Sequence, residues 1–354
     1  MTTMNAKTNV ILLATILLAG CDPATDSGPA LSGVGGIYVI NEGAFTAGNA
    51  ELSYIDPTKG AVSGAVFSTK NPGKTLGDIA QSATLAFGRL FVVVNNSRKI
   101  EVVEPGTHAS LQTISLSTLP RAICVVTPSK AYVTNMDSTV SILDLGAGAE
   151  VNRLTVGTFP EGIIASGELI YVLNGGFGYG TTISVINMLT DSVVRTILTP
   201  YGPSYGLVTS AGFIHVVCTG YQNFSDPLDQ SPGALLTLNA STGSVIDTLW
   251  FNGVAGKLAS AGDGTLFILG PGSGGTQSVW KVSGGASPAT LSPALVVGSY
   301  YGIGVDPQRL ELYLALPGDF VSNGRVEVRS LSGSFVREYV SGIGVAPNGF
   351  VFTN

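Results

Sequence analysis

Apolar residues in this chain gather in short runs of four to six, and turn-forming residues separate the runs. One such run is Ala131-Tyr132-Val133-Thr134-Asn135, and a short turn connects it to a second, Thr139-Val140-Ser141-Ile142-Leu143-Asp144. Runs rich in β-branched and aromatic residues, bounded by Gly, Asn, Asp and Ser, are typical of antiparallel strands. No segment shows a sustained helical period, so the pattern predicts an all-β fold.

The strand pattern repeats along the chain with a period of about forty residues, which in a strand-rich chain indicates the blades of a β-propeller. One copy runs from Pro120 to Val156 and the next from Pro160 to Leu198, and each contains four predicted strands. The second strand of each copy recurs around Tyr38, Phe91, Tyr132, Tyr171, Ile214, Phe267, Tyr313 and Phe350.

Eight recurrences of the second strand leave seven intervals, so we predict a seven-bladed propeller with four-stranded antiparallel blades; eight blades are the alternative. Closure into a ring is expected because an open stack of sheets would leave an uncovered face at each end. Gly342 to Pro347 copies a first strand, whereas Ile37 begins a second one, so the N- and C-terminal segments should share the closing blade. The segment Phe350-Val351-Phe352-Thr353 also resembles a second strand and is left over as a surplus.

The first twenty residues have the features of a secretory signal peptide, namely Lys7 followed by the apolar run Val10 to Leu18. The run is about half the ~20 residues that a membrane-spanning helix needs. Leu18-Ala19-Gly20-Cys21 resembles the bacterial lipobox, which implies cleavage before Cys21 and lipidation of that cysteine. We therefore expect a signal peptide at 1–20, a lipidated and flexible tether at 21–36 and the propeller at 37–354, with membrane contact only through the lipid anchor.

Composition and charge narrow the choice of function. Charged residues make up 11% of the chain, the net charge is −6 and no Lys/Arg cluster occurs, so a nucleic-acid partner is not expected. The chain has only two histidines and no metal, acyl-transfer or nucleotide motif, and we predict no metal, no cofactor and no enzymatic activity. Cys124 and Cys218 are predicted to be two buried thiols, with a disulfide between them as the alternative.

Several segments resemble a known family. Tyr132-Val133-Thr134-Asn135, the Pro-x-Gly-Ile opening at Pro160 and third strands ending in Val-Ile-Asn or Ile-Leu-Asp resemble the YVTN repeat of YncE-like β-propellers. The segments Tyr38 to Gly43 and Leu76 to Ser82 resemble the surface-layer-type lipoproteins of that family, which include the BtuG group of vitamin B12-binding propellers. This resemblance implies a lipoprotein of the outer membrane, expected at the cell surface with a periplasm-facing position as the alternative.

Aromatic side chains are concentrated in loops expected on one face of the disc. Aromatic rings with polar tips are frequent where a large flat partner is held by stacking and hydrogen bonds. We predict a ligand site formed by Arg121, Glu161, Phe177, Tyr179, Tyr201, Tyr205, Tyr221, Phe224, Tyr300, Tyr301 and Phe320.

The resemblance implies capture of a small molecule, cobalamin-like or another nutrient, that is passed to a TonB-dependent outer-membrane transporter. Two alternatives remain at this point. One is a structural or protein-interaction propeller of the cell envelope, and the other is an enzyme resembling the streptogramin lyases, with Glu42 or Glu161 as its base.

Overall fold

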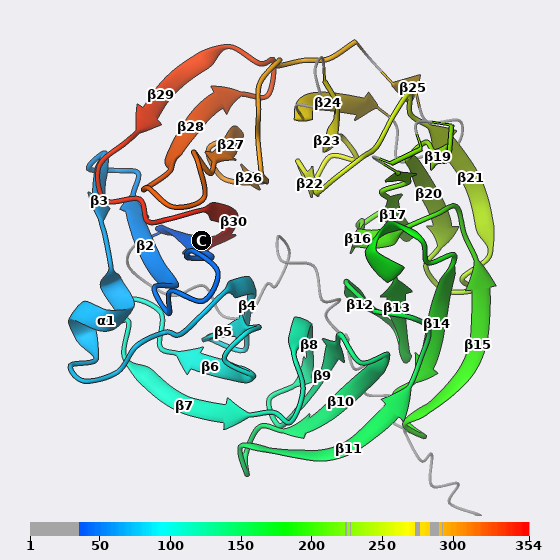
Figure 1. Cartoon of the computed structure of the whole chain (residues 1–354), viewed down its shortest axis with the longest axis horizontal. Helices are drawn as coiled ribbons and strands as arrows, with labels where there is room; N and C mark the ends of the chain where they lie inside the picture. The colour runs from blue at the N-terminus through cyan, green and yellow to red at the C-terminus, as the bar shows by residue number, and fades with distance from the viewer. Residues whose placement is uncertain are drawn as a thin grey trace, which may run out of the picture.

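Seven four-stranded antiparallel sheets surround a central axis as the blades of a propeller (Figure 1). The computed structural model describes residues 35–353 except 224, 227, 273–276, 284–289 and 292. In each blade the first strand lies nearest the axis and the fourth lies at the rim (Figure 1). The predicted all-β fold and the count of seven blades are confirmed.

We number the blades in chain order and list their strands from the axis outward. Blade 1 consists of β4 (Ala80–Ala86), β5 (Arg89–Val94), β6 (Lys99–Val103) and β7 (Ser110–Ser115). Blade 2 consists of β8 (Pro120–Thr127), β9 (Lys130–Asn135), β10 (Thr139–Asp144) and β11 (Ala149–Thr155). Blade 3 consists of β12 (Ile163–Ser166), β13 (Leu169–Asn174), β14 (Thr182–Asn187) and β15 (Ser192–Leu198).

The next three blades follow the same order. Blade 4 consists of β16 (Pro203–Val208), β17 (Phe213–Cys218), β20 (Ala234–Asn239) and β21 (Val245–Trp250). Blade 5 consists of β22 (Leu258–Ser260), β23 (Leu266–Pro271), β24 (Gln277–Ser283) and β25 (Thr290–Leu291). Blade 6 consists of β26 (Gly302–Asp306), β27 (Glu311–Leu316), β28 (Arg325–Ser330) and β29 (Phe335–Tyr339).

The two ends of the chain share blade 7, as predicted. Its innermost strand is β30 (Pro347–Phe352), which pairs with β1 (Ile37–Asn41), and β2 (Glu51–Asp56) and β3 (Ala61–Ser63) complete it. The sequence-based assignment of Gly342 to Pro347 as the first strand is wrong, because that strand begins only at Pro347. Phe350 therefore lies on the innermost strand, pairs with Val39 and is not a surplus second strand. The ring is closed by Thr353, whose Oγ1 donates to the Gly36 carbonyl at 2.9 Å.

The second strands are buried on both faces because each blade is packed between two others. All residues of β9 and β13 after the first are buried, whereas β15 at the rim is exposed at six of its seven positions. Among the described residues, seven apolar clusters form the core, and clusters join neighbouring blades. Phe91 of blade 1, for example, shares a cluster with Val133 of blade 2.

Tyrosines on the second strands of three blades contact the blade that follows. The Tyr38 hydroxyl contacts His108 Nδ1 of blade 1 at 2.6 Å, and the Tyr132 hydroxyl donates to the Asp191 carboxylate of blade 3. The Tyr171 hydroxyl reaches the Ala240 carbonyl of blade 4 at 3.4 Å. In these three blades the repeated tyrosine is therefore an architectural residue that bonds to the neighbouring blade.

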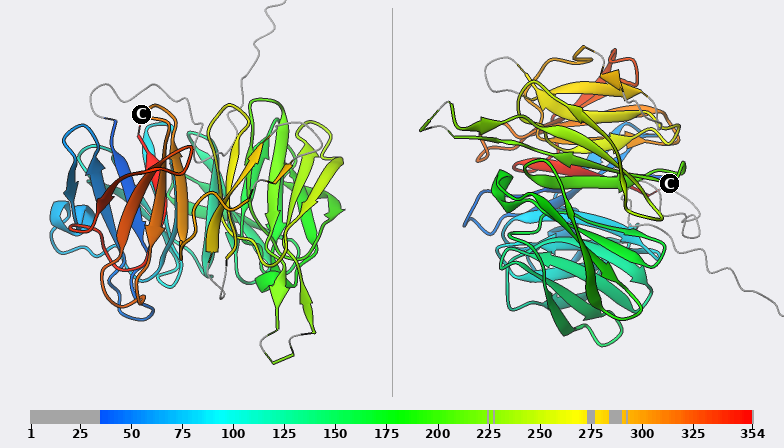
Figure 2. Two further views of the ribbon diagram at one scale, coloured as in Figure 1. Left: turned by 90° about the horizontal axis from the view of Figure 1, so that it is seen from above. Right: turned by 90° about the vertical axis from the view of Figure 1, so that its right-hand side faces the viewer.

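Three small elements interrupt the blades. Helix α1 (Val66–Lys70) follows β3, the 3-10 turn η1 (Gly176–Gly178) follows β13, and a hairpin of β18 (Tyr221–Gln222) and β19 (Gln230–Ser231) follows β17. The hairpin extends from one face of the disc, and the C-terminus lies at the opposite face (Figure 2).

Candidate functional site

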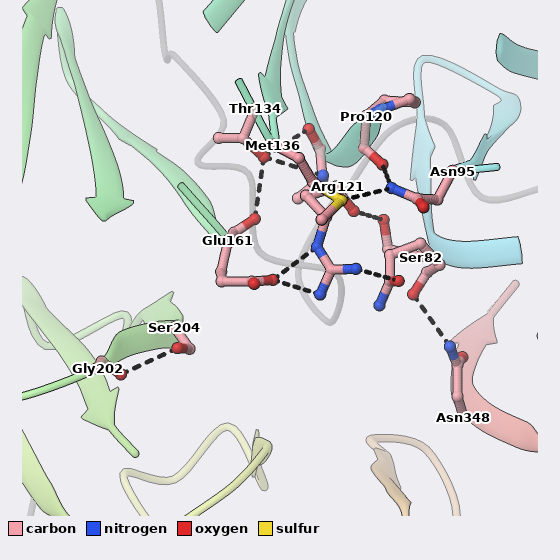
Figure 3. A network of polar contacts seen from close by, with 12 residues as sticks. Ser82, Asn95, Pro120, Arg121, Thr134, Met136, Glu161, Gly202, Ser204 and Asn348 are labelled. Carbon is pink, nitrogen blue, oxygen red and sulfur yellow. Dashed lines mark hydrogen bonds and ion pairs between the residues drawn. The ribbon is translucent and has the colours of Figure 1, made fainter. Parts of the chain in front are cut away.

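The innermost strands of the seven blades each place one side chain near the axis, at or just before the start of the strand. These side chains are Gln81, Arg121, Glu161, Tyr205, Lys257, Tyr301 and Asn348. We call them the axial ring. Three of them, Arg121, Glu161 and Lys257, are charged. Direct contacts connect several ring residues across blade boundaries. Figure 3 shows those around Arg121.

One side of the axial ring is electrically neutral because Arg121 and Glu161 form an ion pair. The Arg121 Nε and Nη2 atoms both donate to Glu161 Oε2, at 2.8 and 2.5 Å, and Nη1 donates to Gln81 Oε1 (Figure 3). The two side chains are only 18% and 14% exposed. A pair of this kind fixes both side chains in orientation and leaves no net charge.

The other side of the ring holds Lys257 beside a buried carboxylate. The Lys257 ammonium lies 4.8 Å from the centre of the Tyr301 ring and donates to the Asn348 carbonyl at 2.6 Å. Glu42, at the end of β1, accepts from the Tyr301 hydroxyl at 3.0 Å and from Asn348 Nδ2 at 2.6 Å. Desolvation lowers the pKa of Lys257 to about 8, although the neighbouring Glu42 opposes the shift.

Two cavities open around the axial ring, and we call them together the mouth. The first, of about 750 Å³, is lined from blades 4 to 6 by Tyr205, Lys257, Tyr300, Tyr301 and Phe320 among others. The second, of about 330 Å³, is lined by Arg121, Glu161, Phe177, Tyr179, Tyr205 and Tyr221 among others. Tyr205 lines both cavities as well as the axial channel of about 220 Å³ beneath them. Burial raises the pKa of Tyr205 to about 12, so its hydroxyl stays protonated at neutral pH.

The aromatic residues of the second cavity stack on one another. Tyr179 lies 4.5 Å from Tyr221, and Tyr201 contacts Tyr221 edge-on at 5.0 Å between ring centres. Tyr179 remains 54% exposed and Phe177 56% exposed, so rings from η1 and the hairpin present free faces to solvent. Each such pair stabilises the folded loops by about 1 kcal/mol beyond the free energy gained from burying the rings.

Glycine allows the loop around η1 to hold its aromatic residues in place. A Cβ on Gly180 would lie 1.8 Å from the Asn174 carbonyl oxygen, so no larger residue fits where the loop returns to β14. Phe177 itself has a φ of 53°, a left-handed conformation that costs energy for a residue other than glycine. This strained position turns the Phe177 ring toward Phe159 at 4.8 Å.

The structure gathers most of the predicted site residues around the mouth. Of the eleven, nine line its two cavities, and Tyr201 contacts Tyr221 beside them. Phe224 and the lipidation residue Cys21 lie outside the described residues, as do the signal peptide and nearly all of the tether. Ligand binding by the nine residues stays a prediction.

Sequence reasoning missed Lys257, Gln81 and Asn348 as site residues and treated Glu42 only as a candidate base. A usable signal existed in the proline that precedes the ring position in Pro120-Arg121, Pro160-Glu161 and Pro347-Asn348. The repeat is degenerate at Gly256-Lys257, and this explains why Lys257 escaped notice.

The histidines and cysteines are structural in the described chain. His215 Nδ1 lies 3.1 Å from Thr237 Oγ1, and burial lowers the pKa of His215 to about 4. Cys218 is a free buried thiol, as predicted, but Cys124 is disulfide-bonded, so the prediction of two free thiols is wrong for Cys124. Within the described ranges, no group of three His, Cys, Asp or Glu side chains could hold a metal ion. The same part of the chain contains no helix long and apolar enough to cross a bilayer.

A family model matches most of the chain. Residues 35–317 match the family model described as "Domain of unknown function (DUF5074)", and the chain belongs to this family. No curated protein matches the sequence. Structural relatives include propellers with lactonase-like and quinoprotein-like names, and the finer resemblance to YncE-like and BtuG propellers stays a prediction.

Three solved structures illustrate the similarity. A quinonprotein alcohol dehydrogenase-like protein from Bacteroides thetaiotaomicron has a TM-score of 0.68 at 13% identity, over 90% of this chain and 78% of that one. The periplasmic gluconolactonase of Pseudomonas aeruginosa has a TM-score of 0.65 at 13% identity, over 89% and 99%. Hydrazine synthase of Kuenenia stuttgartiensis has a TM-score of 0.61 at 18% identity, over 74% and 85%.

These relatives correct one sequence-based prediction. The absence of a catalytic motif led us to predict that the chain is not an enzyme, yet structures of the same fold include a gluconolactonase and hydrazine synthase. The prediction is wrong, because it relied on the lack of a local motif. A propeller can build an active site from loops that are distant in sequence, and no local motif reveals such a site.

Proposed function

We propose that the chain binds a small molecule with a flat, partly apolar body across the mouth of the propeller. The observation that carries this proposal is the convergence of both cavities on Tyr205. Aromatic residues from blades 3 to 6 surround that point, with polar side chains of the axial ring beneath them. Concave sites lined by aromatic residues and a few convergent polar groups are the usual form of ligand sites.

The size of the mouth supports a large ligand. Its two cavities of about 750 and 330 Å³ adjoin at Tyr205, whereas single pockets for drug-sized molecules span ~300–1,000 Å³. A cobalamin-like molecule, with a flat corrin ring and polar amide arms, is the first candidate because of the resemblance to BtuG propellers. Delivery to a TonB-dependent transporter is part of the same proposal.

The position of the chain ends is consistent with capture at a membrane surface. Gly36 and Thr353 bond to each other, and the C-terminus lies at the face opposite the hairpin that borders the mouth (Figure 2). A tether that leads to a lipid anchor on Cys21 would therefore start from the face opposite the mouth.

Calorimetric titration of the full chain with cyanocobalamin tests the proposal. We expect saturable binding at one site per chain. Tyr179→Ala should weaken it about tenfold, whereas Phe335→Ala, which removes a similarly exposed ring from the rim strand β29, should leave it unchanged. A titration without binding heat would exclude cobalamin as the ligand. An equal loss of affinity in both variants would exclude the mouth as the binding site.

Catalysis on the bound molecule is a second candidate, favoured by the geometry of Glu161. Both Arg121 contacts go to Glu161 Oε2, so Oε1 makes no hydrogen bond among the described residues and lies at the second cavity. A carboxylate held in this way could activate a water molecule. Acid release from glucono-δ-lactone, followed in a pH-stat, is expected to exceed the background rate, and Glu161→Gln should abolish the excess; a rate equal to background with the unaltered chain removes this candidate.

A further inference from the structure

We infer that the first cavity binds the oxyanion of an aromatic or similarly flat ligand, with a carboxylate or phosphate group on the Lys257 ammonium and the ring beside Tyr301. This inference rests on the proposed function and names the class of ligand. It assigns Lys257 a role in recognition that the sequence pattern did not suggest.

Charge is the first argument. Among the described residues, the charged side chains that line the first cavity are Lys257 and Arg325, and both are cations. The chain as a whole carries a net charge of −6, so a cavity with cations and no carboxylate in its wall runs against the overall composition. Attraction between a fixed cation and an anionic ligand is strong in such a partly desolvated site.

Lys257 is the cation of the two that has no carboxylate partner among the described residues. Arg325 Nε is paired with Glu338 Oε1 at 2.9 Å. Lys257 makes no ion pair among the described residues. The Glu42 carboxylate accepts hydrogen bonds from the Tyr301 hydroxyl and from Asn348 and does not line the cavity. An ammonium has three N–H donors, and the described contacts of Lys257 use one of them, on the Asn348 carbonyl.

Neutral donors surround the same space. The Tyr205 hydroxyl and the side chains of Gln277, Ser299 and Asn323 line the first cavity and make no hydrogen bond within the described part of the chain. An oxyanion accepts several hydrogen bonds at once, and charge-assisted bonds are roughly twice as strong as neutral ones. The cavity therefore offers a cation together with free donors.

Aromatic rings complete the recognition of a flat body. The Tyr301 ring carries the Lys257 ammonium on its face and meets Phe320 edge-on, with 5.1 Å between ring centres. Phe320 is 46% exposed and borders the entrance. A ring attached to the oxyanion would continue this aromatic wall while its charged group reaches Lys257.

A charge series of small probes tests the inference on the unaltered chain. Benzoate and phenylphosphonate represent carboxylate and phosphate-type anions, benzyl alcohol is a neutral analogue and benzylammonium a cationic one. Titrations followed by NMR should show both anions binding at least tenfold more tightly than benzyl alcohol, and benzylammonium not at all. If only one of the two anions binds more tightly than benzyl alcohol, the result identifies whether the cavity takes a carboxylate or a phosphate-type group. Equal binding of the charged and neutral probes would overturn the inference.

Variants locate the charge. Lys257→Met should lower benzoate affinity at least tenfold, Lys257→Arg should retain most of it, and Lys59→Met, an exposed lysine outside the mouth, should have no effect. Should Lys257→Met fail to fold, the probe series on the unaltered chain still decides. Failure of both anions to bind would overturn the inference. The cyanocobalamin titration is a separate experiment and tests the proposed function independently.

Discussion

The two cavities of the mouth use the same ring position in different blades and reach opposite electrostatic states. In the second cavity Arg121 is neutralised by Glu161 and the rings stack on one another, so recognition there depends on surface shape and aromatic faces. In the first cavity Lys257 has no carboxylate partner and the neutral donors make no hydrogen bond, as far as the described residues show. The comparison shows how a repeated fold can hold two chemically different subsites within one mouth, because each blade contributes one variable side chain to a fixed position.

Breaking the Arg121–Glu161 ion pair of the second cavity should have the largest effect, and the effect should be on stability. Arg121→Leu leaves the Glu161 carboxylate largely buried without its guanidinium, and we expect a loss of about 2 kcal/mol in the free energy of unfolding. Urea denaturation measures it. The double variant Arg121→Leu/Glu161→Leu should recover much of the loss; no recovery would show that packing and not charge holds this side together.

Anion binding in the first cavity should depend on pH. Benzoate keeps its charge between about pH 6 and pH 10, whereas Lys257 has a pKa of about 8, so its cationic form is present below that pH and is lost above it. We expect benzoate affinity to fall roughly tenfold between about pH 7 and pH 9. The charged or titratable groups around Lys257 are Glu42, Arg121, Glu161, Tyr205 and Tyr301, and Arg325 lines the same cavity.

Two controls separate Lys257 from those neighbours. Lys257→Arg should abolish the fall in affinity, because a guanidinium stays protonated throughout this range. An unchanged pH profile in that variant would assign the titration to another group and would weaken the contrast between the two cavities.

Removing one aromatic ring from the second cavity should have the smallest effect of the three changes. Tyr221→Ala removes the partner of both Tyr179 and Tyr201, and we expect cyanocobalamin affinity to fall about fivefold, equivalent to ~1 kcal/mol. Tyr221→Phe keeps the ring and should bind nearly as well as the unaltered chain. Benzoate binding should be unchanged in either variant, and a change would mean that the two cavities do not act independently.

The sequence predicted the architecture well because the propeller is encoded locally. Each second strand carries its own apolar run, and residues such as Tyr132 recur at the period of the blade. The one error in topology, at Phe350, arose because first and second strands are both buried and read alike. Only pairing with Val39 distinguishes them.

The site was predictable only in part. Loop aromatics such as Tyr179 and Tyr301 stand out in composition, and the structure places them at the mouth. The role of Lys257 depends on contacts with Tyr301 and Asn348, which are separated from it by many residues in sequence. The state of charge in each cavity follows from such contacts and cannot be read from one repeat.

Hydrogen–deuterium exchange of the full chain with and without cyanocobalamin tests the central claim most directly. The account predicts slower exchange in the loops of the mouth, including 175–180, 219–222 and 317–324, with no change near Gly36 and Thr353 on the opposite face. Protection on that opposite face, or none in the mouth at saturating cyanocobalamin, would contradict it.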